Sequence, residues 1–162
     1  MCKDIDSFET DRLSFRGISL ADADLIIKLR SDPEVYRFFK SPHKISFDEH
    51  INWYYNCYLS SNKRFDWICI EKSTGTRIGV FGIFIEDGKA EVNYILSPES
   101  QHNGYAYEGL NALLQYSIDK WSVHEIIAEI HKENTASISL VKKIGFDLIS
   151  SNGLFTVYGY EV

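Results

Sequence analysis

Apolar and polar residues alternate in several stretches of the chain, and this two-residue period predicts β-strands. The predicted strands cover 13–18, 65–71, 77–86, 89–96 and 123–131, with two more in a hairpin within 146–162. Asp87-Gly88 and Asn152-Gly153 are pairs typical of tight turns, so each is expected to close a hairpin. Two glycines inside 77–86 predict a bulge or a close backbone approach in that strand.

Four other stretches carry apolar residues at the three- and four-residue spacing of a helix. They are 20–30, a segment after Ser46, 105–121 and 133–145. Ser19 and Ser46 are predicted N-caps, because an acidic residue follows each of them three positions later. The last helix is expected to be capped by Asn134 or Thr135 and to end at Gly145.

This order of elements predicts a single domain over residues 1–162, since no Pro/Gly/Ser-rich linker divides the chain. The expected fold is α+β, an α/β/α sandwich whose mixed, mostly antiparallel central sheet of about seven strands carries helices on both faces. Strand 89–96, helix 105–121 and strand 123–131 form a βαβ unit, so the two strands are expected to run parallel. Ligands of such units bind beside the helix N-terminus.

Composition narrows the class of protein. The 162 residues are 44% hydrophobic and 25% charged, and the net charge of −6 disfavours binding to nucleic acid. Cys2, Cys57 and Cys69 are too widely spaced for a zinc site or a disulfide scaffold, and Cys69 is expected to be buried. A polar N-terminus and the absence of a long apolar run predict no signal peptide and no membrane contact, so a cytoplasmic location is expected.

The stretch QHNGYAYEG at 101–109 lies where an anion-binding loop would sit, between a strand and a helix. Free backbone N–H groups and the helix dipole favour an anion there, and the small Gly104 and Ala106 leave room for it. No lysine follows as in a Walker loop, and the dinucleotide glycines are missing. On spacing alone, a pyrophosphate cradle and a plain strand–turn–helix connection remain equally open.

The residues around this loop carry a resemblance to a known family. QHNGYA resembles the Gln/Arg-x-x-Gly-x-Gly/Ala signature of the GNAT superfamily of N-acetyltransferases. The stretches ETDRL, AEVNYIL, AYEGLNALLQYS, HEIIAEIHKENTAS and KKIGF also match in order, over nearly the whole chain. Together they resemble the subgroup that contains ribosomal-protein N-terminal (alanine) acetyltransferases. The resemblance implies acetyl-coenzyme A (acetyl-CoA) as co-substrate, no metal, and a monomer or homodimer.

The resemblance also implies which residues hold acetyl-CoA. The backbone near Tyr94 would pair with the pantetheine arm, and the loop would donate N–H groups to the pyrophosphate. The implied cofactor-binding residues are Ile95, Leu96, Gln101, His102, Asn103, Gly104, Tyr105, Ala106, Asn134 and Ser137. For Asn134, plain helix capping is the alternative, and for Ser137 close packing alone is an equally open alternative.

Acetyl transfer to an amine needs a base to take the amine proton, and Glu91 on strand 89–96 is the candidate. On a partly buried face its pKa would be raised, which suits a base, whereas a position at the solvated edge of the sheet is an equally open alternative. His43, His50 and His131 are the alternatives. The family's tyrosine acid is replaced by Val141, and Glu108 is interpreted as structural because an acid in a first helical turn is favoured by the dipole.

The acceptor site implied by the resemblance lies between the first two helices and the sheet. Its expected lining is aromatic: Phe38, Phe39, Trp53, Tyr54, Tyr94 and Tyr158. The expected reaction is acetyl transfer from acetyl-CoA to a primary amine, such as a peptide N-terminus or a small amine, by direct attack in a ternary complex. An amino-sugar or nucleotide-sugar acceptor is one alternative, and a non-catalytic CoA-binding regulatory protein is another.

Overall fold

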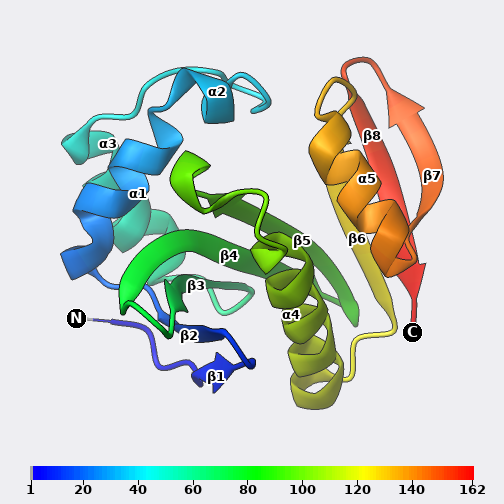
Figure 1. Ribbon diagram of the computed structural model, residues 1–162, viewed down its shortest axis with the longest axis horizontal. Helices are drawn as coiled ribbons and strands as arrows, with labels where there is room; N and C mark the ends of the chain where they lie inside the picture. The colour runs from blue at the N-terminus through cyan, green and yellow to red at the C-terminus, as the bar shows by residue number, and fades with distance from the viewer. Residues whose placement is uncertain (1) are drawn as a thin grey trace.

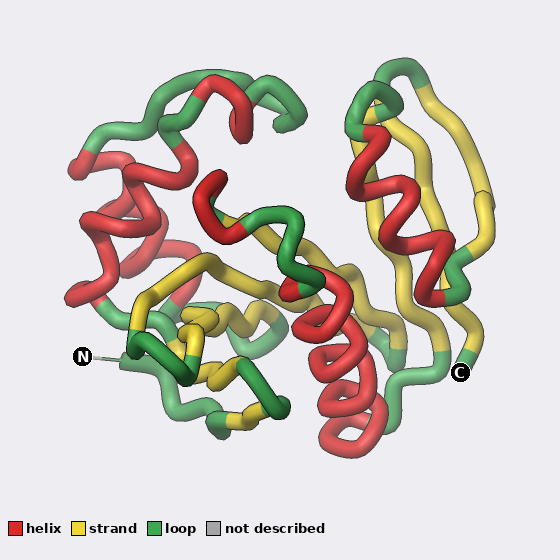
Figure 2. The backbone as a smooth tube through the Cα atoms, viewed as in Figure 1, coloured by secondary structure: helices red, strands yellow, loops and turns green. Residues whose placement is uncertain are grey.

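The computed structural model describes residues 2–162 and forms one eight-stranded sheet with helices on both faces (Figure 1, Figure 2). The strands lie in the order β1-β2-β3-β4-β5-β6-β8-β7. Their bounds are β1 Phe8–Glu9, β2 Leu13–Gly17, β3 Arg64–Glu71, β4 Thr76–Glu86, β5 Lys89–Leu96, β6 Glu125–His131, β7 Asp147–Asn152 and β8 Phe155–Glu161. The mixed, mostly antiparallel α+β sandwich is therefore confirmed.

The sheet has one strand more than the sequence predicts. The extra strand is β1, which has only two residues and pairs antiparallel with β2 at the edge of the sheet. Two residues show no period, so the alternation that identified the other strands gives no signal for β1.

The helices follow the predicted caps. Their bounds are α1 Ala23–Arg30, α2 Pro33–Tyr36, α3 Phe47–Trp53, α4 Tyr105–Trp121 and α5 Thr135–Ile144. Ser19 and Ser46 both form complete capping boxes, although a 3₁₀ turn separates Ser19 from the start of α1. Asn134 caps α5, whose C-cap is Gly145 at a φ of 119°. The short α2 was not expected; Asp32 caps it by accepting the N–H of Glu34 at 2.9 Å.

Helices on the two faces of the sheet enclose two separate apolar cores. The larger core lies under α4 and α5, and the smaller lies under α1 and α3. Strand β3 contributes to both, because Trp67 and Cys69 point into the larger core and Ile68 into the smaller. Cys69 is fully buried as expected, and this burial raises the pKa of its thiol to about 12.

The glycines of β4 mark a close backbone approach, as predicted. A Cβ built on Gly79 would lie 2.3 Å from the carbonyl oxygen of Ile95 in the neighbouring strand. The register of β3 against β4 also shifts between Cys69 and Ile70, beside Gly79. This bulge bends β4 where β5 approaches its end, and so shapes the sheet near the predicted cofactor site.

Strands β5 and β6 are parallel, joined by α4 as the βαβ unit predicts, and they pair over only a short length. Residues 89–91 of β5 pair with 125–127 of β6, and the pairing ends there. Figure 1 shows the two strands meeting at one end and diverging towards the other, with α5, β7 and β8 following β6. The edge of β5 from Val92 onward is thereby released from β6 and is available to pair with a ligand.

Candidate functional site

A cavity of ≈ 880 Å³ occupies the space beside the released part of β5. This volume lies within the roughly 300–1,000 Å³ typical of ligand sites. Nine of the ten predicted cofactor residues line it: Ile95, Leu96, Gln101, His102, Gly104, Tyr105, Ala106, Asn134 and Ser137. The tenth, Asn103, is outside this lining, and its side-chain amide donates to the carbonyls of Ser100 and Gln101. Asn103 therefore stabilises the loop from within.

The loop before α4 has the backbone of an anion cradle. Gly104 stands at the N-cap of α4 with a φ of 79°, a left-handed conformation that favours glycine. Because Gly104 has no side chain, it leaves the N–H groups of the first helical turn without a side-chain cap from that position. His102, two residues earlier, also has a positive φ of 65°. The arrangement suits the pyrophosphate of acetyl-CoA, whose oxygens would accept those N–H groups.

Glu108 fastens this loop to the start of β2. Its carboxylate accepts hydrogen bonds from the Thr10 hydroxyl at 2.7 Å, the Arg12 backbone at 3.0 Å and the Arg12 Nε at 2.7 Å. Burial alone would raise the pKa of Glu108, but these bonds hold it below its usual range. Arg12 also donates to the Asn103 carbonyl at 2.8 Å and stacks over Tyr105. These contacts agree with the structural interpretation of Glu108.

Asn134, Ser137 and Tyr94 form a hydrogen-bonded group across the same cavity. The Asn134 side chain accepts the N–H of Ser137 at 3.3 Å, and the Ser137 hydroxyl lies 3.0 Å from that of Tyr94. Burial raises the pKa of Tyr94 and outweighs its bond to Ser137. The sequence predicts Tyr94 at the acceptor; in the structure its ring stacks on Phe81 and it lines the larger cavity.

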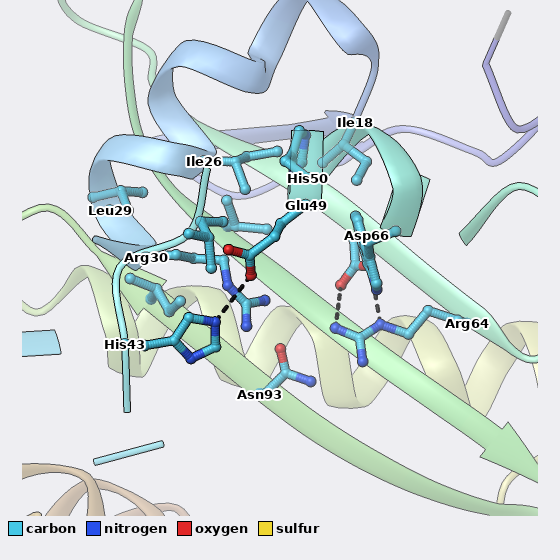
Figure 3. A pocket seen from close by; sticks show the side chains of 14 residues that line it. Ile18, Ile26, Leu29, Arg30, His43, Glu49, His50, Arg64, Asp66 and Asn93 are labelled. Carbon is cyan, nitrogen blue, oxygen red and sulfur yellow. Dashed lines mark hydrogen bonds and ion pairs between the residues drawn. The ribbon is translucent and has the colours of Figure 1, made fainter. Parts of the chain in front are cut away.

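A second, smaller cavity of ≈ 230 Å³ lies between α1, α3 and the sheet face of β3–β5 (Figure 3). Of the aromatic residues predicted at the acceptor, Trp53 lines this cavity, whereas Phe38 and Phe39 line the larger one. Asn93 and Ile95 line both cavities, so the two meet on β5.

Tyr54 and Tyr158 are corrections to the expected aromatic lining. Tyr54 is 0% exposed and packs in the smaller core, and Tyr158 is 4% exposed and packs in the larger one. Tyr54 follows α3 in helical phase, with its N–H donating to the His50 carbonyl, and its ring packs in the smaller core with Ile26 of α1 and Ile68 of β3. The π-helical turn, Tyr54–Tyr58, begins at this residue.

Glu91 does not have the environment that its proposed role assumes. It is exposed rather than partly buried, and neither cavity includes it in its lining. Ile95 lies four positions further along the strand, a distance of about 13 Å. A role as the base would therefore need a chain of water molecules between Glu91 and the amine. Of the alternatives, His43 and His50 line the smaller cavity and His131 lines the larger.

The smaller cavity is lined by charged residues that the sequence did not predict at the site. Arg30 reaches it from α1, while Arg64 and Asp66 reach it from β3 (Figure 3). Asp66 is 2% exposed. An acid inside the apolar run 65–71 was the available signal, since a buried carboxylate needs a partner.

Most of the chain matches the model of one protein family. Residues 12–147 match the acetyltransferase (GNAT) domain. The chain belongs to the GNAT acetyltransferase family. It is accordingly an acetyl-CoA-dependent N-acetyltransferase, and the GNAT resemblance seen in the sequence is confirmed. The cavity and the Gly104 cradle fit the co-substrate that this family uses.

Individual relatives agree on the family and differ in what their names say. An uncharacterised N-acetyltransferase, p20 of Bacillus licheniformis, is 29% identical over 147 residues, which are 88% of this chain and 83% of that protein. The spermidine N(1)-acetyltransferase of Vibrio cholerae is 27% identical over 138 residues, 83% of this chain and 79% of that protein. The structure of a V. cholerae spermidine N-acetyltransferase with CoA and spermine superimposes with a TM-score of 0.81 at 22% identity, covering 93% of this chain and 94% of that one.

Two features are absent from residues 2–162. None of the helices in this range has the length and apolar character needed to cross a membrane. In the same range, no group of three or more His, Cys, Asp and Glu side chains is arranged to hold a metal ion.

Proposed function

We propose that this GNAT enzyme transfers the acetyl group of acetyl-CoA to a primary amine by direct attack within a ternary complex. The observation that carries the proposal is the meeting of two cavities at Asn93 and Ile95. One cavity has the size and the N–H donors for acetyl-CoA, and the other is a separate compartment for the amine. Direct attack requires both substrates to be held together, and this arrangement provides for that.

The cofactor-binding roles follow from the lining of the larger cavity. The loop 101–106 would bind the pyrophosphate, and the released edge of β5 near Ile95 and Leu96 would pair with the pantetheine arm. A backbone N–H near Leu96 would donate to the thioester oxygen as negative charge develops there. In the reaction a bond forms between the amine nitrogen and the acetyl carbon, the carbon–sulfur bond breaks with CoA leaving as its thiolate, and the amine proton passes through water to the predicted base, Glu91.

The proposal also names a base and candidate acceptors. Glu91 stays the predicted base, acting through water, because it lies on the same strand as Ile95. The resemblance to the ribosomal-protein acetyltransferase subgroup favours a peptide N-terminus as acceptor. The similarity to the V. cholerae spermidine N(1)-acetyltransferase makes a polyamine a second candidate. A panel of amines is therefore the appropriate first assay.

Initial-rate kinetics test the order of the chemistry. With acetyl-CoA and an amine both varied, a ternary complex gives intersecting double-reciprocal lines. Parallel lines would show that an acetyl-enzyme forms first and would contradict direct attack. CoA release that no amine in the panel increases would contradict a role as an amine acetyltransferase and favour CoA binding without transfer.

A further inference from the structure

Arg30 places a cation in the smaller cavity without an acidic partner. Among residues 2–162, its Nε atom is buried and has no hydrogen-bond partner, and no carboxylate forms an ion pair with its guanidinium. The guanidinium does make a cation–π contact, with its carbon 5.2 Å from the centre of the Phe39 ring. A half-buried arginine in this state is costly for the protein unless another group pairs with it.

The other charged groups of the cavity already have partners. Asp66 accepts two hydrogen bonds from Arg64, at 2.9 and 3.0 Å, which neutralise it. Glu49 lies 2.9 Å from His43, and this contact raises the pKa of His43. The two carboxylates of the cavity are thus held by partners other than Arg30, which leaves the Arg30 guanidinium without a counter-ion there.

A second polar atom in the cavity is also unsatisfied. His50 is 2% exposed, and its Nε2 atom has no hydrogen-bond partner within the described part of the chain. Burial lowers the pKa of His50, and the nearby Arg30 lowers it further, so its imidazole is neutral near pH 7. A buried polar atom without a partner destabilises the fold, and a ligand in the cavity that bonds to it would remove that destabilisation.

Figure 3 shows the side chains of Arg30, Arg64 and Asn93 directed towards the same space. Arg64 keeps donors beyond the two that bind Asp66, since a guanidinium has five N–H groups. These donors surround the part of the cavity next to β5, where the larger cavity begins. The cluster of donors matches a carboxylate or a phosphate, which arginine binds through paired N–H groups.

We propose that the smaller cavity binds an anionic group, a carboxylate or a phosphate, carried by the amine that is acetylated, with Arg30 as its main partner. This inference rests on the proposed function and specifies its acceptor class. At ≈ 230 Å³, the cavity is below the roughly 300 Å³ at which ordinary ligand sites begin, so it accommodates one small group rather than a long chain. A polycation such as spermidine is disfavoured, because it would place further positive charge beside Arg30.

Matched pairs of amines test the charge preference. Glucosamine 6-phosphate against glucosamine tests the phosphate, and glycine against glycinamide tests the carboxylate, with spermidine as the polycation. We expect kcat/KM to be at least about 10-fold higher for the anionic member of one pair than for its neutral member. The pair that shows the difference identifies the anionic group.

Arg30→Gln tests the residue. It should lower kcat/KM for the preferred anionic amine by about 10- to 100-fold and change the value for its neutral partner by less than about 3-fold. Arg30→Lys keeps the charge but not the paired donors, so an intermediate loss is expected. Lys28→Gln removes one positive charge from an exposed position of the same helix and is the matched control.

The inference is overturned if wild type prefers the neutral amines or spermidine, or if Arg30→Gln affects both members of each pair equally. In either case the proposed amine acetylation still stands. If Arg30→Gln is unfolded by circular dichroism, the wild-type pairs and Arg30→Lys decide. If no amine is acetylated, calorimetric titration of the same amines into CoA-saturated protein decides: selective binding of the anionic members, weakened in Arg30→Gln, supports the site, and its absence refutes it.

Discussion

Gly104→Val is the sharpest perturbation of the cofactor loop. Gly104 has a φ of 79°, and a Cβ at this position would meet only the Arg12 Nη2 atom, at 3.3 Å. That atom ends a flexible side chain and can move, so the fold itself is not blocked. The branched valine side chain would instead stand over the first-turn N–H groups of α4, where the pyrophosphate oxygens are proposed to bind.

The two effects of this substitution differ in size. A side chain in the left-handed region costs about 1–2 kcal/mol, which lowers Tm by about 2–8 °C in a chain of this length. Loss of the N–H donors should weaken CoA binding by about 100-fold or more, because several charge-assisted hydrogen bonds are lost together. Thermal unfolding measures the first effect, and calorimetric titration with CoA measures the second.

Gly75→Val is the matched control. Gly75 has a φ of 72°, and a Cβ there meets nothing within 4 Å. It should therefore show a similar loss of stability with wild-type CoA affinity. Wild-type affinity in Gly104→Val would refute the cradle, and equal loss of affinity in both variants would show that the effect is not local.

Three further predictions concern acidic residues. Asp22 is 0% exposed and binds Arg16 at 2.8 and 2.9 Å, so Asp22→Ala should lower the free energy of unfolding by about 3–5 kcal/mol in urea titrations, against less than about 1 kcal/mol for Asp24→Ala at the surface. Burial alone would raise the pKa of Asp22, but hydrogen bonds, led by that from Arg16, hold this pKa below 3.8 in the folded protein. The ionised Asp22 therefore stabilises the fold fully above pH 3.8, and this stabilisation is lost as the pH falls through the lower pKa of the folded state. An Asp22→Ala variant with the same loss of stability at every pH would contradict this. Glu108→Gln should keep kcat at saturating acetyl-CoA within about 3-fold of wild type, whereas a catalytic role predicts a loss of about 100-fold or more. Glu91→Gln should lower kcat by about 100-fold at unchanged CoA affinity if Glu91 is the base through water, and an unchanged kcat would remove it from the mechanism.

Local signals in the sequence were sufficient for most of the scaffold. The capping boxes, the start of α5 at Asn134 and its end at Gly145 depend on residues within a few positions of each other, and the structure has them as predicted. The divergence of β5 from β6 has no signal in any local pattern of the sequence. It is nevertheless the feature that opens the larger cavity.

The parts that failed depend on contacts distant in the sequence. The family resemblance placed Tyr54 at the acceptor, but its ring is fully buried in the smaller core with Ile26 and Ile68, a packing that no local pattern reports. Arg30 and Asp66 line the same cavity although they are 36 positions apart in the sequence, and only the packing of α1 on the sheet brings them together. The exposure of Glu91 likewise depends on what covers β5, which a strand period does not report.

The most direct test of the account is mass spectrometry of amines incubated with the protein and isotopically labelled acetyl-CoA. The account predicts a labelled acetyl group on a primary amine, formed in step with CoA release and lost in Gly104→Val at low acetyl-CoA. Release of CoA with labelled acetate as its sole product, across peptide, polyamine, amino-sugar and anionic amines, would contradict it.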